Sequence, residues 1–216
     1  MKTDSQKKIE LEYRFLIPRE RIMVIPPHEV ANFVLNNSTV VVFQDFLFER
    51  TGTPLKDDNV GFRLRKRDDT DIEFTYKKFL GKENGMARYD EFTTKVNLDE
   101  FNDLIRGKFA NPRLFMLREL MKKGELYYFL TINNKRMKFN YVSTICNAEL
   151  VIEDLMYSSG KKSIPDSALE IEFNIVDGYQ DKVDVFVEDI KKLYLCMDQN
   201  EGKNTRAIKL LDLSLK

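Results

Sequence analysis

The chain has 216 residues, of which 43% are hydrophobic, including 16 Phe and 9 Tyr, which is ample material for a sizeable core. Its 35 basic and 35 acidic residues cancel, so the composition argues against a non-specific nucleic-acid or membrane binder, and any strong field must be local. No apolar run reaches the ~20 residues that span a bilayer, and the first residues lack the apolar part of a signal peptide, so we expect a cytoplasmic protein.

Several absences narrow the chemistry. The only histidine is His28, which we place at a helix start in contact with water, so histidine-based nucleophilic catalysis is not expected. Cys146 and Cys196 lie far apart without metal-ligand spacing, and we expect two buried free thiols. The chain has no glycine-rich phosphate loop of the usual kinds. If the protein binds phosphate, side chains must bind it.

Alternation of apolar and polar residues predicts a mostly antiparallel sheet, and no linker divides the chain, so we expect one domain of residues 1–216. The stretch 157–167 is predicted to be a surface loop between two strands. Helices that cover the sheet are predicted at 27–36, 98–108, 112–122 and 181–196. Strands are predicted at 8–16, 41–49, 60–67, 71–79, 86–94, 126–132, 135–142, 148–156 and 168–176.

The first predicted strand, I-E-L-E-Y-R-F-L-I, separates apolar from charged side chains. Its apolar members share one side of an extended chain, and Glu10, Glu12 and Arg14 share the other. A polar strand face usually contacts water, and for any one strand that interpretation is the simpler one. Two carboxylates beside a guanidinium are nevertheless an unusual set for one strand, and the later strands show whether the pattern recurs.

The later strands repeat this separation with a bias in residue type. A solvated face mixes polar residues loosely, whereas here some strands carry basic residues at a spacing of two and others carry glutamates. This pattern suits a sheet rolled into a barrel, with its apolar side outward under the helices and its charged side lining a lumen. The polar faces comprise Arg63, Arg65, Arg67, Glu73, Thr75, Lys77, Arg88, Asp90, Arg136, Lys138, Asn140, Glu149, Glu153, Glu170, Glu172 and Asn174.

Such a lumen needs an occupant. Facing carboxylates stay ionised at close range only with a cation between them, and a dense basic set needs a multiply charged anion. A divalent metal and a polyphosphate meet these two demands, and ligation by oxygen alone favours Mg²⁺ or Mn²⁺. Glu10 and Glu12 would then hold metal, while Arg14 would reach a phosphate oxygen or a neighbouring carboxylate.

At this point the residues resemble the CYTH family, also called triphosphate tunnel metalloenzymes, from Glu10 to about Leu211. Single motifs of this length are weak, whereas eight in the right order are specific. Two departures are arginine at position 14, where the family has lysine, and the loosely matched Lys203-Asn-Thr-Arg206. The matching elements are Glu10-Leu-Glu12-Tyr-Arg14, the segment from Gln44 to Thr51, Phe62-Arg63-Leu-Arg65, Thr75-Tyr-Lys77, Arg88-Tyr-Asp90, Arg136-Met-Lys138-Phe-Asn-Tyr141, Ile152-Glu153-Asp-Leu155 and Glu170-Ile-Glu172.

The resemblance implies an α+β fold, an eight-stranded antiparallel β-barrel or tunnel with a charged interior, covered by helices. It also implies Mg²⁺ or Mn²⁺ as cofactor and a triphosphate-containing small molecule as partner. Catalytic roles would fall to Arg14, Glu10 and Glu12, and metal binding to Glu10, Glu12, Glu153, Glu170 and Glu172. Substrate binding would fall to Arg63, Arg65, Lys77, Arg88, Arg136, Lys138 and Arg206.

The leading hypothesis is metal-dependent hydrolysis of the terminal phosphate of tripolyphosphate, thiamine triphosphate or a nucleoside triphosphate. One alternative is a class IV type adenylate cyclase, which would release pyrophosphate from ATP instead of orthophosphate. Another is a polyphosphate- or nucleotide-binding module without turnover, suggested by Arg14, because arginine cannot give up its proton. The sequence leaves the organic part of the substrate and the oligomeric state open.

Overall fold

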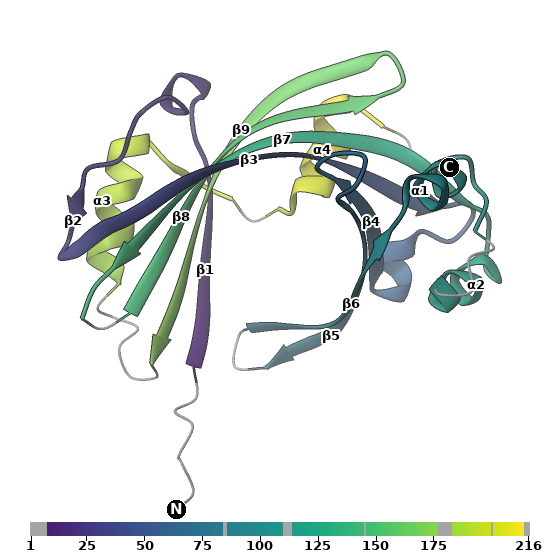
Figure 1. Ribbon diagram of the computed structural model, residues 1–216, viewed down its shortest axis with the longest axis horizontal. Coiled ribbons are helices and arrows are strands. Elements are labelled where there is room, and N and C mark those ends of the chain that lie inside the picture. Colours follow the sequence, from purple (N-terminus) through teal and green to yellow (C-terminus); the bar gives the residue numbers. More distant parts are fainter. Residues whose placement is uncertain are drawn as a thin grey trace, which may run out of the picture. The chain divides into compact units, whose positions relative to one another are not determined.

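The computed structural model describes residues 8–83, 86–109, 114–144, 146–176, 183–199 and 201–213 (Figure 1). The side chains of residues 8–12, 82–83, 86–89 and 174–176 lie outside this description. The elements in chain order are β1 (Lys8–Leu16), the 3-10 turn η1 (Arg19–Arg21), β2 (Glu29–Val30), β3 (Phe33–Arg50), η2 (Leu55–Asp58), β4 (Val60–Lys66), β5 (Ile72–Glu83), β6 (Met86–Val96), α1 (Leu98–Ile105), α2 (Phe115–Met121), β7 (Leu126–Val142), β8 (Cys146–Ser159), β9 (Lys162–Val176), α3 (Asp184–Tyr194), β10 (Met197–Asp198) and α4 (Lys203–Leu211).

The strands within the described residues pair in the order β10-β1-β9-β8-β7-β3-β4-β5-β6, and β2 pairs with β3. Eight of these strands have seven residues or more, whereas β2 and β10 have two each. The predicted class, an α+β fold built on eight antiparallel strands, is confirmed. None of the helices in the described ranges is long and apolar enough to cross a membrane.

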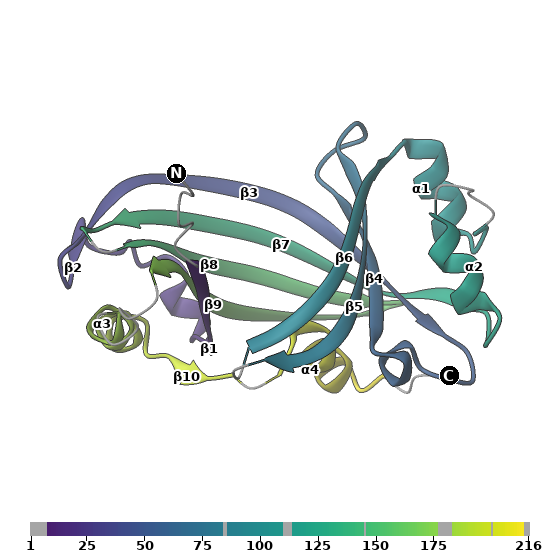
Figure 2. The ribbon, with the colours of Figure 1, turned by 90° about the horizontal axis from the view of Figure 1, so that it is seen from below.

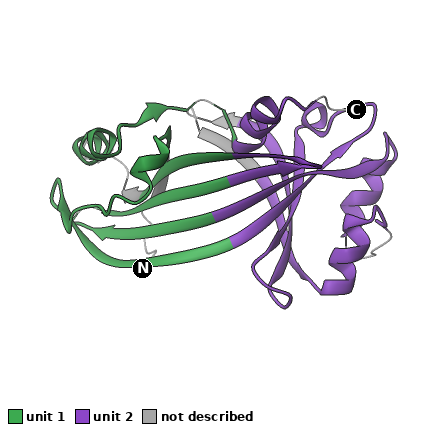
Figure 3. Ribbon diagram, turned by 90° about the horizontal axis from the view of Figure 1, so that it is seen from above, with its two compact units in different colours: residues 1–42, 135–155, 165–202 green, residues 43–134, 156–164, 203–216 purple. Residues whose placement is uncertain are grey.

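The chain forms two compact units, which are drawn in separate colours in Figure 3. The first unit holds residues 1–42, 135–155 and 165–202, and the second holds residues 43–134, 156–164 and 203–216. Because the boundary cuts β3, β7, β8 and β9 within their length, each of these strands contributes residues to both units.

The core of the first unit forms where α3 covers the apolar face of its strands (Figure 2). Phe186 of α3 is fully buried, and its ring centre lies 4.8 Å from that of Phe33, 5.3 Å from Tyr141 and 5.6 Å from Phe173. Such ring contacts add to the free energy that apolar burial contributes. The polar end of Tyr141 is satisfied, since its hydroxyl donates to the Pro27 carbonyl at 2.7 Å. Burial raises the pKa of Tyr141 to about 12.

The core of the second unit lies between β4, β5 and the helices α1 and α2. Phe62, Leu64 and Phe74 alternate with polar residues along the strands and are buried against the helix residues Leu104 and Leu117. The apolar faces of these strands are therefore the helix-covered ones, as the alternation predicts.

The segment 27–36 forms β2 and the start of β3, so the predicted helix there is wrong. Ala31 and Asn32 have φ values of 48° and 68°, and a two-residue turn with both φ angles positive joins the antiparallel pair Val30 and Phe33. His28 consequently precedes a strand and not a helix.

The segment 157–167 is a tight hairpin and not the predicted loop. β8 ends at Ser159 and β9 begins at Lys162, and Gly160 in the turn has φ 57°. The helices predicted at 98–108, 112–122 and 181–196 correspond to α1, α2 and α3, while α4 was not predicted. Both cysteines are free as predicted, but only Cys146 is buried, since Cys196 is partly exposed.

Gly124 is a position where the backbone requires glycine. Its φ is +154°, and an added Cβ would lie 2.1 Å from the Thr51 carbonyl oxygen. We expect Gly124→Ala to lower the free energy of unfolding by about 1–3 kcal/mol, because strained backbone and a backbone clash combine. Gly61→Ala is the matched control, since nothing lies within 4 Å of its added Cβ. Urea unfolding of both variants is the measurement, and equal stabilities would contradict the expectation.

Candidate functional site

The pairing of β1 with β9 aligns the first and last charged motifs of the chain. The register places Arg14 opposite Glu170, Glu12 opposite Glu172 and Glu10 opposite Asn174. Directly opposed residues of an antiparallel pair belong to the same face of the sheet. The backbone therefore brings the E-x-E motifs at the two ends of the chain together, although the side chains of Glu10 and Glu12 lie outside the described residues.

A chain of ion pairs follows this face in the first unit. Arg136 Nε lies 2.6 Å from Glu153 Oε1, and its Nη2 lies 3.5 Å from Glu170 Oε2. On the other side of Glu170, Arg14 Nε lies 3.8 Å from Oε1. Because Glu153 is fully buried, the 2.6 Å contact with Arg136 offsets the cost of removing its charge from water. Two guanidinium groups thus flank Glu170.

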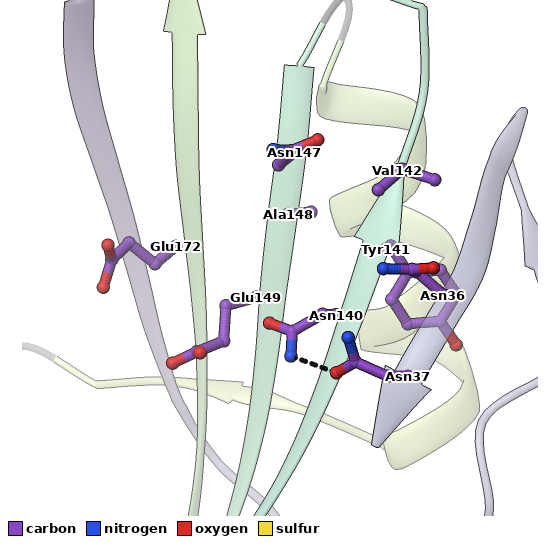
Figure 4. Close-up of a pocket in the computed structure, with 9 residues that line it drawn as sticks. All are labelled: Asn36, Asn37, Asn140, Tyr141, Val142, Asn147, Ala148, Glu149 and Glu172. Carbon is purple, nitrogen blue, oxygen red and sulfur yellow. Dashed lines mark hydrogen bonds between the residues drawn. The ribbon is translucent and has the colours of Figure 1, made fainter. Parts of the chain in front are cut away.

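Lys138 and Glu149 form a further pair on β7 and β8. Lys138 Nζ lies 2.8 Å from Glu149 Oε1, and both side chains are half-buried. Glu149 and Glu172 line one pocket of about 380 Å³, together with residues of β3 and β7 (Figure 4). The sequence placed Glu149 on the charged face and predicted that Lys138 binds substrate. Their contact shows that the carboxylate of Glu149 neutralises the positive charge of Lys138 in this structure.

Asp45 organises the basic residues of the second unit. Arg65 donates two hydrogen bonds to it, Nε to Oδ1 at 2.7 Å and Nη2 to Oδ2 at 2.8 Å. Arg63 Nη1 donates a longer bond of 3.5 Å to Oδ2. The Arg65 guanidinium also lies over the Phe43 ring, 3.8 Å from its centre. Sequence reasoning missed Asp45, although its position in the Gln44 to Thr51 element was available as a signal.

The strand register extends this face through β5 and β6. Arg63 lies opposite Thr75, and Lys77 lies opposite Glu91, with Lys77 Nζ 2.7 Å from Glu91 Oε2. Asp90, which the sequence placed on the same face as Lys77, lies opposite Lys78 instead. Glu91 is therefore the acid that accompanies Lys77, and simple alternation could not locate it because the register shifts between Phe79 and Gly81.

Two further predicted substrate residues, Arg88 and Arg206, are placed by the strand and the helix that carry them. The side chain of Arg88 is outside the described residues, and the register places its backbone opposite Gly81. Arg206 is a half-buried residue of α4 in the second unit. Their assignment to substrate binding stays a prediction.

The acids of the first unit are suited to a hard divalent cation by their chemistry. All five predicted ligands are glutamates, and oxygen ligands are those that Mg²⁺ and Mn²⁺ prefer. In the pairing of β1 with β9, Glu170 lies opposite a basic residue, Arg14. Glu172 lies opposite another glutamate, Glu12. Among the side chains that the structure describes, which exclude Glu10 and Glu12, no three acidic, histidine or cysteine residues are grouped as a metal site.

The sequence model of the CYTH domain matches residues 8–206 of this chain. The chain belongs to the CYTH family. Members of this family bind triphosphate-containing molecules and generally use divalent metal ions. The family resemblance stated from the sequence motifs is thereby confirmed.

Solved structures agree with the CYTH fold. A candidate adenylate cyclase from Bacillus halodurans is 18% identical with a TM-score of 0.59, and the match covers 93% of this CYTH chain and 98% of that one. A candidate adenylyl cyclase from Hippeastrum, described as having a dominant triphosphatase activity, is 12% identical with a TM-score of 0.61, covering 93% and 96%. A Pyrococcus horikoshii protein is 14% identical with a TM-score of 0.51, covering 94% and 99%. At these identities the likeness shows the fold alone. A comparison with curated proteins found no match.

Proposed function

We propose that this CYTH protein hydrolyses the terminal phosphate of a triphosphate-containing substrate with the help of Mg²⁺ or Mn²⁺. The proposal rests on the difference between two positions of the β1–β9 pairing, one where a glutamate lies opposite an arginine and one where a glutamate lies opposite a glutamate. Glu170 is flanked by Arg14 and Arg136, whereas the ladder sets Glu172 opposite Glu12. Arrays that place opposed carboxylates beside fixed guanidinium groups suit a complex of a divalent cation with a phosphate chain.

The acids Glu10, Glu12, Glu153, Glu170 and Glu172 are the residues that we propose to hold the cation. When bound, the cation would neutralise phosphate oxygens and lower the pKa of a coordinated water. Of these acids, Glu153 contacts Arg136 at 2.6 Å in a fully buried position, so it also orients this guanidinium.

The basic residues supply the positive charge that a triphosphate needs. We propose that Arg63, Arg65, Lys77, Arg88, Arg136, Lys138 and Arg206 bind phosphate oxygens and stabilise the charge that develops on the leaving group. Arg14 is proposed to act from its place opposite Glu170, as a fixed cation that orients the terminal phosphate. Because arginine keeps its proton, Arg14 is not assigned the role of a general base.

The products of ATP turnover test this proposal directly. Purified protein is incubated with ATP, thiamine triphosphate and tripolyphosphate, each with Mg²⁺ or Mn²⁺, and orthophosphate and pyrophosphate are measured separately. Hydrolysis predicts orthophosphate and loss of release when a chelator is added. Pyrophosphate from ATP would identify a cyclase instead, and tight binding without either product would identify a binding module.

Arg63 is expected to contribute more to substrate affinity than to the fold. Its 3.5 Å contact with Asp45 is longer than the two bonds that Arg65 donates, so its guanidinium is less committed to Asp45. We expect Arg63→Ala to weaken triphosphate binding by ~1.5–3 kcal/mol, the range for hydrogen bonds to charged groups.

Titration calorimetry with tripolyphosphate is the measurement for Arg63→Ala. The control is Arg67→Ala, one residue after the end of β4, because Arg67 pairs with Asp71 and Glu73 at 3.0 and 3.1 Å. Equal affinities of wild type and Arg63→Ala would show that Arg63 does not contact the substrate.

A further inference from the structure

The pocket of the first unit is lined on one side by amides and on the other by acids (Figure 4). We call Asn36, Asn37, Asn140 and Asn147 the asparagine patch. The pocket volume of about 380 Å³ lies within the roughly 300–1,000 Å³ of small-molecule sites. Glu172, a proposed cation ligand, lines the same pocket. A substrate whose phosphates are held beside Glu172 would therefore have a cavity available for the rest of the molecule.

The asparagine patch retains hydrogen-bonding capacity toward a ligand. Asn140 Nδ2 donates to Asn37 Oδ1 at 2.6 Å, as the dashed line in Figure 4 shows. A side-chain amide has two donor hydrogens and an oxygen with two lone pairs, so this bond uses only part of what the pair offers. Asn36, Asn37 and Asn147 are exposed, and Asn140 is half-buried, so a ligand can reach all four amides.

The charge of the pocket distinguishes between ligands. The amides are neutral, and the only charged groups that line the pocket among the described residues are Glu149 and Glu172. Lys138 lies 2.8 Å from Glu149 and balances its charge. With no basic side chain in this lining, the amide side is unsuited to phosphate and suited to an uncharged group with donors and acceptors.

The remaining lining residues are consistent with a flat heterocycle. Val142 is exposed and provides apolar surface beside the amides, whereas Ala148 is buried in the core beneath the pocket. Tyr141 is fully buried and donates its hydroxyl to the Pro27 carbonyl, so its polar end is committed to the core. Discrimination in this pocket must then come from the amides.

We propose that the asparagine patch recognises the uncharged, hydrogen-bonding ring of an organic triphosphate and makes the protein prefer such a substrate over inorganic tripolyphosphate. This inference rests on the proposed function. The chemistry fits an amino-substituted pyrimidine or a purine, each of which presents adjacent donors and acceptors that side-chain amides can pair with. The patch would act as a specificity determinant, and the cleavage itself would remain with the charged residues.

The test compares the KM values of ATP, CTP, thiamine triphosphate and inorganic tripolyphosphate for wild type and the double variant Asn37→Ala/Asn140→Ala. For the organic triphosphate with the lowest wild-type KM, we expect the double variant to raise KM about tenfold, as two lost hydrogen bonds predict. The KM of tripolyphosphate is expected to stay unchanged, since it has no ring. Asn102→Ala on α1 is the matched control and should alter neither value.

The outcomes separate this inference from the proposed function. Turnover of tripolyphosphate with no change in organic KM, or an equal rise for both substrate types, would overturn the role of the patch and leave hydrolysis standing. If no product forms, dissociation constants from calorimetry replace KM, and the same selective loss would support the patch while counting against hydrolysis. A wild type that binds none of the four probes would overturn both. Asn37→Ala alone, at an exposed position, gives the same comparison if the double variant fails to fold.

Discussion

Glu172→Gln should abolish most of the metal-dependent release of phosphate while leaving the protein at least as stable. Glutamine keeps the shape of the side chain but removes the charge at the position opposite Glu12. We expect a loss greater than the roughly 10–100-fold that follows removal of an outer partner of a metal site, because Glu172 is proposed to bind the cation directly. The free energy of unfolding should stay equal or rise, since one of two like charges at opposed positions of the ladder is removed.

Phosphate release at a series of Mn²⁺ concentrations, together with urea unfolding, measures both effects. Glu188→Gln is the matched control, because Glu188 pairs with Lys191 on the exposed side of α3 and has no proposed role. Full activity of Glu172→Gln at every Mn²⁺ concentration would remove Glu172 from the set of cation ligands. A large loss of stability would instead point to a structural role.

Arg50→Ala should give the largest loss of stability of any substitution considered for this protein. Arg50 is fully buried, and its Nε and Nη1 donate to the carbonyls of Thr53 and Leu120 at 2.7 and 3.2 Å. Its Nη2 lies 2.8 Å from Asp58 Oδ2. Truncation would leave a cavity and would remove the donors of a buried carbonyl, that of Leu120, and a partly buried one, that of Thr53, so we expect the free energy of unfolding to fall by roughly 3–5 kcal/mol.

Urea unfolding at neutral pH measures the effect, with Lys122→Ala as control because its pair with Glu119 is exposed. Hydrogen bonds from Lys123 and Arg50 lower the pKa of Asp58 below its ordinary value, so the stability from this pair is present at neutral pH and is lost as pH falls through that lowered pKa. The difference between wild type and Arg50→Ala should therefore narrow in acid. A difference below about 1 kcal/mol at neutral pH would show that the surroundings of Arg50 repack without cost.

The sequence predicts the strands well wherever one face is buried and alternation is regular. Leu64 is fully buried, whereas its neighbours Arg63 and Arg65 are only half-buried, so the period of two is visible in the sequence. The alternation fails as a guide at N-N, residues 133–134, which looked like a break although β7 continues from Leu126 to Val142. Asparagine is typical of turns, but Asn134 is buried and lies in the middle of β7, so its residue type is misleading here.

Turn conformations account for two errors of the fold prediction, at 27–36 and at 157–167. In the segment 27–36, apolar residues three and four positions apart fit a helix, but positive φ angles at Ala31 and Asn32 reverse the chain after Val30. The sequence does not distinguish this turn from a helix, because neither Ala31 nor Asn32 is the glycine that is common at positions with positive φ. In 157–167 the serines and lysines suggested a loop, although a hydrogen bond of 2.9 Å joins Ser158 and Ser163 across the hairpin.

The charged faces of β4 and β5 could be predicted from the sequence, whereas the charged face of β6 and the partners within the faces could not. Strand parity identifies Arg63 and Arg65 as neighbours, whereas only the register with β3 shows that both share Asp45. The bulge between Phe79 and Gly81 shifts β5 against β6, so Glu91 and not Asp90 accompanies Lys77. The register between strands that are far apart in the sequence is set by the fold, so it cannot be predicted from the residues of one strand.

The pairing of β1 with β9 has a consequence for the synthesis of the protein. β1 ends at Leu16 and its long partner begins at Lys162, so about two-thirds of the chain lies between the two strands that carry Glu12 and Glu172. Contacts of such sequence separation form late, because closing the intervening chain costs entropy before the contact repays it. A nascent chain still on the ribosome carries Glu12 without its partner strand until translation passes residue 172. The opposed glutamates, and any metal affinity that depends on them, arise only after nearly the whole chain has emerged.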